Sequence, residues 1–411
     1  MNEQPTLFEG ARMTLTRSIE LTTESMNEYG PLYDHWVIAF SGGKDSTAVA
    51  TIIPHLISHG LIPKPKSLTV LYADTRMELP PLQNSAMNVM RQLEEMGIKC
   101  RVVFPKMDDR FFVYMFGRGV PPPSNTFRWC TAQIKIEPML AALKSLRDET
   151  GEKLLMLTGV RVGESAARDA RISLSCGKNN SECGQGWFQV STPESIADTL
   201  APILHWRVCM VWKWLRQYAP MCGFHTEQVA DAYGGTEAEE VNCRTGCVGC
   251  NLASRDSALE ELLKNPQWKY LQPLMRLRPL YAELKKPKNR LRKTMRETRK
   301  DGTMVTNPNR MGPLTMDTRR WGLLEVLKIQ EEINSQAGDA PHVVLIDQIE
   351  QARIMELIEC GQWPNGWTGK EERADALFTE IYPDGSIQDS FMRQMLQADE
   401  VEEPELSALT T

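Results

Sequence analysis

Seven consecutive residues near the start of the chain combine the backbone and side chains needed to bind a phosphate group. They are Ser41, Gly42, Gly43, Lys44, Asp45, Ser46 and Thr47. An apolar run, Trp36 to Phe40, precedes them and predicts a buried strand, and residues 47–58 predict a helix. Glycines let the backbone approach a ligand, and free amides at a helix start attract negative charge, so this stretch predicts an anion site.

The side chains of this stretch strengthen that prediction. Ser41, Ser46 and Thr47 offer hydroxyl groups, and Lys44 offers a positive charge. The spacing excludes a Walker A loop, in which the Gly-Lys pair stands further from the first glycine. It does not match the dinucleotide-binding fingerprint either. The remaining alternative is an ordinary glycine-rich turn between a strand and a helix.

A sheet must position these residues, and the neighbouring sequence predicts one. Strands are expected at 68–73, 99–104 and 154–157, and helices at 12–30 and 84–96. This alternation predicts an α/β fold with a parallel, twisted, Rossmann-like sheet flanked by helices. Ligands of such sheets bind at the carboxyl ends of the strands, where the Ser41 loop and Asp74 both lie. Asp74 either contacts the ligand there or caps the segment that follows it.

Arginines follow the strand expected at 154–157. Gly159 and Arg161 come first, and Arg168 and Arg171 follow after another glycine. A single arginine usually marks a solvated surface. Three arginines around a glycine turn at a strand end favour a site for phosphate.

The second half of the chain predicts helices separated by irregular segments. Residues 172–202 are rich in Gly, Ser and Asn and predict an irregular insertion, and 219–250 is also rich in loops. Helices are expected at 127–138, 206–218, 259–277, 315–335 and 345–360, with breaks or kinks at Pro266 and Pro273. Trp206, Trp212 and Trp214 are expected in the core rather than on a base-stacking surface.

Ten cysteines indicate metal or sulfur chemistry. The chain shows neither a signal peptide nor an apolar run long enough to span a membrane, so we expect a cytoplasmic protein, in which disulfides are rare. Cys243, Cys247 and Cys250 form a C-x3-C-x2-C group that suits an iron–sulfur cluster or zinc. Cys100 and Cys360 stand alone and are expected to be small buried apolar residues.

A run of positive charge interrupts an otherwise acidic protein of net charge −6. Nine basic residues lie between 285 and 300, opposed only by Glu297: Lys285, Lys286, Lys288, Arg290, Arg292, Lys293, Arg296, Arg299 and Lys300. This strip would suit a nucleic-acid backbone, or it is simply a solvated surface helix.

Together these motifs resemble the phosphoadenosine-phosphosulfate-reductase-like branch of the ATP pyrophosphatase (adenine nucleotide alpha hydrolase) superfamily. The likeness is closer still to the DndC/SspD-type proteins of bacterial DNA phosphorothioation systems, and it runs in order from about residue 30 to 330. It is carried by Ser41–Thr47, Asp74–Thr75 with Glu78–Pro80, Gly117–Gly119, Phe127–Thr131 with Lys135, Gly159–Arg161 with Glu164, Ser165 and Arg168, Gly246–Cys250, and Pro313–Thr315 with Arg319 and Arg320.

This resemblance implies an ATP pyrophosphatase. ATP would adenylate a non-bridging oxygen of the DNA backbone and release pyrophosphate, and sulfur from a cysteine desulfurase would then displace AMP. Lys44 and Mg²⁺ would spread the charge of the departing pyrophosphate, while Asp45 would help to position the ion. Arg161 and Arg168 would face the nucleotide phosphates or the DNA. The implied nucleotide-binding residues are Ser41 to Thr47, Asp74, Gly159, Arg161 and Arg168, of which Lys44, Asp45 and Arg161 would be catalytic.

The resemblance also implies an iron–sulfur cluster, of the 4Fe–4S type. Its expected ligands are Cys130, Cys243, Cys247 and Cys250. Cys176 and Cys183 are alternatives for Cys130 and Cys243, and zinc is an alternative for iron. Whether the cluster would be structural or would handle sulfur stays open.

The resemblance further suggests a division of the chain. The expected parts are a helical lead-in at 1–30, a pyrophosphatase domain at 31–218, a cysteine-rich and basic segment at 219–300, and a helical region with an acidic tail at 301–411. The tail from Asp399 is expected to be disordered. Other phosphorothioation proteins are expected partners, and the sequence leaves open whether the protein is a homo-oligomer.

Three other functions stay open at this point. They are reduction of phosphoadenosine or adenosine phosphosulfate, thiolation of tRNA, and an inactive nucleotide-binding scaffold in a defence complex. The intact residues Lys44, Asp45 and Ser46 argue against the scaffold.

Overall fold

The computed structural model describes residues 14–163, 187–189, 196–233, 247–293, 311–376, 380–381 and 387–388. Their contacts divide the chain into two compact units. The first comprises the described residues of Met1–Phe111, Pro123–Met275 and Ile329–Leu345, and the second those of Phe112–Pro122, Arg276–Lys328 and Ile346–Thr411. No helix among the described residues is long and apolar enough to cross a membrane.

The first unit is built on a six-stranded sheet with the order β3-β2-β1-β4-β6-β5. Its strands are β1 (His35–Phe40), β2 (Ser67–Ala73), β3 (Lys99–Val103), β4 (Leu154–Leu157), β5 (Trp187–Gln189) and β6 (Ala197–Ala201). Five strands are parallel, and β5 pairs with β6 in the antiparallel sense. The strand order reverses at β1, which pairs with β2 on one side and β4 on the other. A reversal of this kind opens a ligand-binding crevice at the carboxyl ends of the strands.

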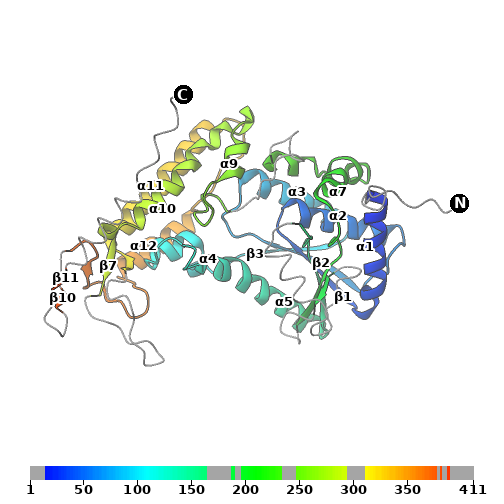
Figure 1. Cartoon of the computed structure of the whole chain (residues 1–411), viewed down its shortest axis with the longest axis horizontal. Coiled ribbons are helices and arrows are strands. Elements are labelled where there is room, and N and C mark those ends of the chain that lie inside the picture. Colours follow the sequence, from blue (N-terminus) through cyan, green and yellow to red (C-terminus); the bar gives the residue numbers. More distant parts are fainter. Residues whose placement is uncertain are drawn as a thin grey trace. The chain divides into compact units, whose positions relative to one another are not determined.

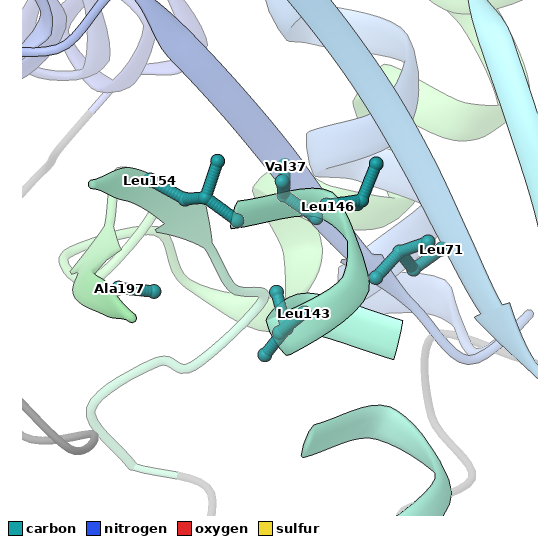
Figure 2. Close-up of a cluster of buried hydrophobic side chains, with 6 residues drawn as sticks. All are labelled: Val37, Leu71, Leu143, Leu146, Leu154 and Ala197. Carbon is teal, nitrogen blue, oxygen red and sulfur yellow. The ribbon is translucent and has the colours of Figure 1, made fainter. Parts of the chain in front are cut away.

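Helices cover both faces of this sheet (Figure 1). They include α2 (Lys44–Ser58) and α3 (Pro80–Glu95) on one face and α5 (Glu137–Thr150) on the other. Leu143 and Leu146 of α5 pack into a core cluster with one residue from each of four parallel strands (Figure 2): Val37, Leu71, Leu154 and Ala197. Each fully buried leucine side chain contributes roughly 1.5–3 kcal/mol to folding. The predicted α/β fold with a parallel sheet is therefore confirmed.

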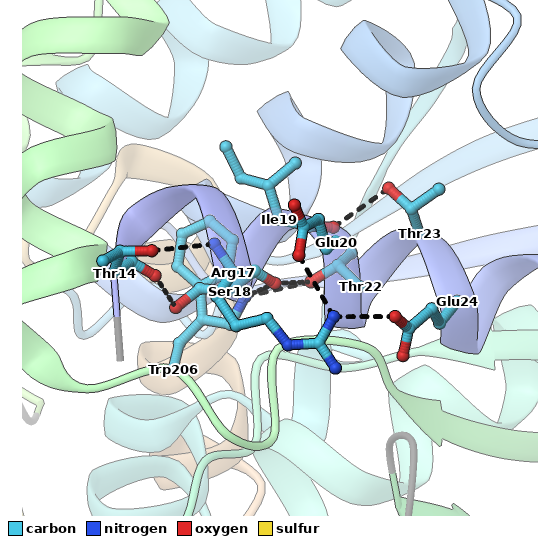
Figure 3. Close-up of polar contacts among 9 residues, drawn as sticks. All are labelled: Thr14, Arg17, Ser18, Ile19, Glu20, Thr22, Thr23, Glu24 and Trp206. Atoms are coloured by element: carbon cyan, nitrogen blue, oxygen red, sulfur yellow. Dashed lines mark hydrogen bonds and ion pairs between the residues drawn. The ribbon is translucent and has the colours of Figure 1, made fainter. Parts of the chain in front are cut away.

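Helix α1 (Leu15–Tyr29) buries three hydroxyl residues, Ser18, Thr22 and Ser25. Thr14 caps its first turn by accepting a hydrogen bond from the amide of Arg17 (Figure 3). The indole of Trp206 donates to the carbonyl of Ser18 and to the hydroxyl of Thr22, at 3.0 and 2.9 Å (Figure 3). These bonds give the buried indole two acceptors and fix α1 against the chain that follows β6.

Most predicted elements of the first unit are present, but several boundaries differ. The helix expected from residue 47 begins at Lys44, and the helix expected from residue 84 begins at Pro80. Proline favours the first turn of a helix because its missing amide would have no partner there. The helix predicted at 127–138 begins as α4 (Trp129–Thr131) and runs through a π-helical turn, Ala132–Ile136, into α5.

The predicted irregular insertion at 172–202 is wrong for β5 and β6, which are strands of the sheet. Strand β6 reads Ala-Asp-Thr-Leu-Ala, a sequence with little intrinsic strand preference. Asp198 is buried in it and receives hydrogen bonds from the hydroxyl of Tyr33 and the ammonium of Lys153. Tertiary partners therefore make this segment a strand.

The tryptophan prediction is confirmed. All three side chains are fully buried. Trp206 precedes α7 (Val208–Lys213), Trp212 lies in α7, and Trp214 begins the π-helical turn Trp214–Tyr218. The predicted break near Pro266 is also present, whereas Pro273 lies inside a continuous 3-10 helix. α9 (Ser257–Leu262) ends before Pro266, and Pro266–Arg276 is a 3-10 helix before α10 (Leu277–Leu284).

The second unit contains helices and a small antiparallel sheet. Its elements are α10, α12 (Gln348–Glu359), the π-helical turn Val113–Gly117, and the sheet β8-β7-β9, with β7 at Arg290–Arg292, β8 at Met311–Leu314 and β9 at Glu372–Arg373. Helix α11 (Met316–Gln336) contributes its first residues here. The short strands β10 (Glu380–Ile381) and β11 (Ile387–Gln388) pair with each other.

The predicted positive strip is wrong for two of its nine members. Arg290 and Arg292 belong to β7 and are buried, where they donate to backbone carbonyls, Arg290 to Gly312 and Arg292 to Ala376. Burial lowers the pKa of Arg290 to about 10, so it stays charged at neutral pH. Residues 294–300 and the acidic tail from Asp399 lie outside the described residues.

Arg319 occupies the centre of the second unit. Its buried guanidinium donates to the carbonyls of Gln362, Gly117 and Leu314, and it lies over the ring of Trp363 at 4.0 Å. Gly119 has a φ of +77°, and a Cβ atom there would lie 2.2 Å from the guanidinium. The backbone therefore needs glycine at 119 for its conformation and for space.

We predict that Gly119→Ala destabilises the second unit by roughly 2–4 kcal/mol, because the left-handed backbone and the overlap with Arg319 both oppose a side chain. The matched control is Gly361→Ala, since Gly361 has a φ of +68° and a Cβ atom there would meet no other atom within 4 Å. This control should lose only about 1 kcal/mol. Thermal unfolding of the full chain measures both losses, and equal losses would contradict the role given to Arg319.

Candidate functional site

The Ser41 loop connects β1 to α2, as predicted. Gly42 has a φ of +73°, and Gly43 caps α2 with an extended backbone. The hydroxyl of Ser46 donates to the carbonyl of Gly43 and accepts from the amide of Ser41, at 3.0 and 3.2 Å. Thr47 makes the first intrahelical bond, from its amide to the carbonyl of Gly43. The amides of the three preceding residues come before that bond and point out of the helix start.

Lys44, Asp45 and Arg161 form a linked group of charges at this helix start. The carboxylate of Asp45 receives Arg161 Nε on one oxygen at 2.6 Å and Lys44 Nζ on the other at 3.1 Å. Arg161 is only 5% exposed, and its Nη1 also donates to the carbonyl of Trp206. The group carries two positive charges and one negative charge, so it favours an anion overall.

Gly159 explains how Arg161 reaches the loop. A Cβ atom at Gly159 would lie 2.7 Å from the backbone carbon of Asp45 and from the amide nitrogen of Ser46. Only a glycine allows the chain after β4 to lie this close to the first turn of α2. The structure thus brings together all the predicted loop residues with Gly159 and Arg161.

Tyr233 also belongs to the site, although the sequence analysis does not find it. It ends the 3-10 helix Glu227–Tyr233, and its hydroxyl accepts the amide of Lys44 at 3.2 Å. The ammonium of Lys44 lies 5.1 Å from the centre of the same ring. The ring of Trp212 packs against the Tyr233 ring in a T-shaped arrangement, with 5.2 Å between centroids. No motif surrounds Tyr233, so only the fold reveals its position.

Asp74 lies at the carboxyl end of β2, where the sequence places it, but its oxygens have local partners. One oxygen accepts the amide of Arg76 and the other accepts the side-chain amide of Gln83. Arg76 has a φ of +64°, which is unusual for a residue with a side chain. Asp74 thus holds the turn that follows β2, whereas the N-cap of α3 is Leu79. A ligand contact of Asp74 stays a prediction.

Glu78 lies in the same turn and is held by Thr75, whose hydroxyl donates to it at 2.6 Å. Burial raises the pKa of Glu78, and the neighbouring Asp74 raises it further. The loop after β2 is thus a buried acidic turn beside the anion site.

Three of the predicted cysteine ligands lie near this turn. The amide of Val248 donates to the carbonyl of Met77 at 2.6 Å, which fixes the Cys247–Cys250 segment to the chain after β2. Burial raises the pKa of Cys130 and of Cys247, and charge on Cys250 disfavours charge on both.

Lys135 links these thiols to the acidic turn. Its ammonium donates to Cys247, and negative charge on that thiol is the main cause that raises the pKa of Lys135, with Glu78 adding to it. Lys135 therefore stabilises negative charge on sulfur at this position.

The described residues do not assemble a metal centre by themselves. No group of three or more His, Cys, Asp or Glu side chains among them is arranged to hold a metal ion. Several predicted residues lie outside this part of the chain: Arg168, Arg171, Cys176, Cys183 and Cys243.

The two isolated cysteines differ from each other. Cys100 is half-buried, and burial raises its pKa to about 12, which fits an unreactive thiol. Cys360 follows the end of α12 and is exposed, so its prediction as a buried residue is wrong.

Comparison with known proteins identifies related chains. An uncharacterised protein of Methanocaldococcus jannaschii is 25% identical over 177 residues, which cover 43% of this chain and 34% of that protein. The chain thus spans about a third of the length of this curated relative. A phosphate complex of phosphoadenylyl-sulfate reductase from Candida auris superposes with a TM-score of 0.35 at 12% identity, covering 57% of this chain and 96% of the other.

A U34-tRNA thiolase from Methanococcus maripaludis, solved with its 4Fe–4S cluster, superposes with a TM-score of 0.32 at 15% identity and covers 66% of this chain and 82% of the other. The family model of the phosphoadenosine phosphosulfate reductase domain matches residues 35–253. This match spans more than half of the chain and includes β1, the Ser41 loop, Arg161 and Cys250. The chain therefore belongs to the phosphoadenosine phosphosulfate reductase domain family.

Proposed function

We propose that this protein is an ATP pyrophosphatase that activates a DNA backbone phosphate for replacement of an oxygen by sulfur. One observation carries the proposal: an anion-binding helix start and a group of thiols lie at the carboxyl ends of two adjacent strands. The Ser41 loop follows β1, and the Cys247 segment is bonded to the chain that follows β2. Phosphate activation and sulfur transfer both need groups of these kinds.

The first step uses the charges at the Ser41 loop. A non-bridging oxygen of the acceptor attacks the α-phosphorus of ATP, the bond to the bridging oxygen breaks, and pyrophosphate leaves with the electron pair. Lys44, the amides at the start of α2, and the buried Arg161 stabilise the charge that develops on pyrophosphate. Asp45 acts by holding Lys44 and Arg161 in place.

The second step replaces the activated oxygen. The terminal sulfur of a persulfide, supplied by a cysteine desulfurase, attacks the acceptor phosphorus, and AMP leaves with the former phosphate oxygen. A thiol then attacks the cysteine sulfur of the persulfide, so that a disulfide forms and the S–S bond breaks to leave sulfur on phosphorus. Lys135, beside Cys247, favours negatively charged sulfur close to that point. Adenylation makes this displacement feasible because AMP is a far better leaving group than an oxide.

The described residues do not form a dedicated magnesium site. Both oxygens of Asp45 hold cations of the protein, and both oxygens of Asp74 accept amide groups. The expected role of Asp45 in positioning Mg²⁺ does not fit these contacts. Mg²⁺ is commonly bound through substrate phosphates, so it would enter with ATP.

The thiols fit an iron–sulfur cluster in their chemistry, since such clusters are held by cysteine. Cys130, Cys247 and Cys250 would hold it together with Cys243. When bound, the cluster would fix this segment structurally or hold sulfur close to the acceptor.

The name of the family favours a second candidate, reduction of a sulfonucleotide to sulfite. In that reaction the Ser41 loop would bind the phosphates of the sulfonucleotide and would release no pyrophosphate.

We predict that purified protein converts ATP into AMP and pyrophosphate when DNA is present. Lys44→Ala and Asp45→Ala should each lower the rate about 100-fold, because each removes or misplaces charge that stabilises the leaving group. The matched control is Asp34→Ala. This residue precedes β1 at the opposite end of the strand and forms a surface ion pair with Lys66.

Pyrophosphate release is the measurement, and the control should keep the rate of the unmodified protein. No release, even with DNA and a cysteine desulfurase added, would contradict the proposal. Production of sulfite from phosphoadenylyl sulfate would then establish the reductase.

We also predict that protein purified without oxygen contains iron and acid-labile sulfide. Cys247→Ser should lose most of both, because it removes a half-buried thiol that is one of the predicted ligands, whereas Cys100→Ser should lose neither. Elemental analysis and sulfide determination measure the contents. Zinc in place of iron would contradict the cluster. If the Cys130→Ser variant keeps its full iron content, the fourth ligand is Cys176 or Cys183 instead of Cys130.

A further inference from the structure

Two phenylalanines beside the site are exposed to an unusual degree. Phe104 is 45% exposed and Phe127 is 48% exposed, whereas Phe40, Phe112, Phe116 and Phe224 are almost completely buried. A single exposed apolar residue needs no explanation. Two aromatic rings on adjoining segments call for one, especially where cations accompany them.

The two segments lie side by side in the first unit. The ring of Phe111 stacks on that of Trp129 with 5.3 Å between centroids. The side-chain amide of Gln133 donates to the carbonyl of Asp109 at 2.9 Å. These contacts hold the chain that follows β3 against the start of α4, so Phe104 and Phe127 belong to one region of the surface.

Positive charge accompanies both rings. The guanidinium of Arg110 lies 6.0 Å from the centre of the Phe104 ring, and Lys106 and Arg128 are exposed. We call Phe104, Lys106, Arg110, Phe127 and Arg128 the aromatic–basic surface. Residues 104–110 and 125–136 contain three cations of this surface, Lys106, Arg110 and Arg128, against two acids, Asp108 and Asp109, while a fourth cation, Lys135, is held by Cys247 and Glu78. This local excess contrasts with the net charge of −6 of the whole chain and suits a polyanion.

The location of this surface connects it with the proposed reaction. Phe104 follows β3, which pairs with β2, and the amide of Asp74 donates to the carbonyl of Val103 at 3.0 Å. Adjacent strands lie about 4.8 Å apart, so the anion site after β1 and the aromatic–basic surface after β3 are separated by roughly 10 Å at the sheet edge. Cys130 lies two residues after Arg128. A strand bound on this surface would therefore pass both the thiols and the Ser41 loop.

We propose that the aromatic–basic surface binds a single-stranded segment of the DNA acceptor, with unpaired bases stacked on Phe104 and Phe127. Lys106, Arg110 and Arg128 contact the backbone phosphates. Exposed rings next to cations are the arrangement by which proteins hold single strands, because every base has a face that can stack. Paired bases in a duplex hide those faces. This inference rests on the proposed function, since it takes DNA as the acceptor.

The test measures binding of a fluorescent single-stranded DNA oligonucleotide to the full-length protein by anisotropy. Phe104→Ala with Phe127→Ala should weaken binding at least about 10-fold, because stacking on each ring is lost. Phe104→Tyr with Phe127→Tyr should bind within about twofold of the unmodified protein, since both rings remain. An oligonucleotide of abasic sites should bind the unmodified protein as weakly as normal DNA binds the double alanine variant.

The matched control is Tyr218→Ala. Tyr218 is 40% exposed and has the ammonium of Lys213 at 6.0 Å from its ring, so it resembles Phe104 with Arg110. It lies in the turn that contains Trp214, which contacts His55 late in α2, away from the helix start. This variant should bind DNA like the unmodified protein.

Several results would overturn the inference. They are unchanged binding in the double alanine variant, equal binding of the abasic oligonucleotide by the unmodified protein, equal or tighter binding of duplex DNA, and tighter binding of RNA with the same sequence. Pyrophosphate release separates this inference from the proposed function. If the unmodified protein releases pyrophosphate but the double alanine variant binds DNA normally, only the inference about the aromatic–basic surface is rejected. If the protein binds single-stranded DNA through this surface but releases no pyrophosphate, the proposed function is rejected and the binding surface is retained.

Discussion

The ion pairs of Asp45 hold the site together. Its carboxylate joins the first turn of α2 to Arg161, which follows β4, and so connects the two sides of the point where the strand order reverses. A buried guanidinium without a partner would be costly, because removing one member of a buried pair leaves the other charge unsolvated. The carboxylate also keeps the ammonium of Lys44 beside the loop. The position of both cations thus depends on one acidic side chain that need never touch the substrate.

The candidate functional groups lie along the carboxyl edge of the sheet, one after each of four strands. Arg161 follows β4, the anion site follows β1, the acidic turn with the Cys247 segment follows β2, and Phe104 follows β3. These are four adjacent strands, so groups that are more than a hundred residues apart in the chain are neighbours in space. Parallel strands make this possible because all their carboxyl ends meet at one edge.

Much of this arrangement is predictable from the sequence. Apolar runs predict β1, β2 and β4, while β3, which is only partly buried, is expected from its place in the alternation of strands and helices. The glycines and hydroxyls after β1 predict the loop because a turn of that kind needs those residue types. Strand β6 is not predictable, since Asp198 contradicts a buried strand until Tyr33 and Lys153 are placed beside it. The prediction that Arg290 and Arg292 lie on a surface strip is wrong for a related reason. Their charge suggests a surface, but backbone carbonyls from distant parts of the second unit receive them inside.

The hydroxyl of Tyr233 has a consequence for how tightly the loop can hold a nucleotide. It accepts the Lys44 amide, which is one of the donors that a phosphate oxygen would use. Binding of a phosphate at this amide is therefore an exchange of one acceptor for another, and its net gain is smaller than that of filling an unsatisfied donor. The same exchange works in reverse, because the phenol can return to the amide as a product departs. A loop whose anion must leave again benefits from holding that anion only moderately.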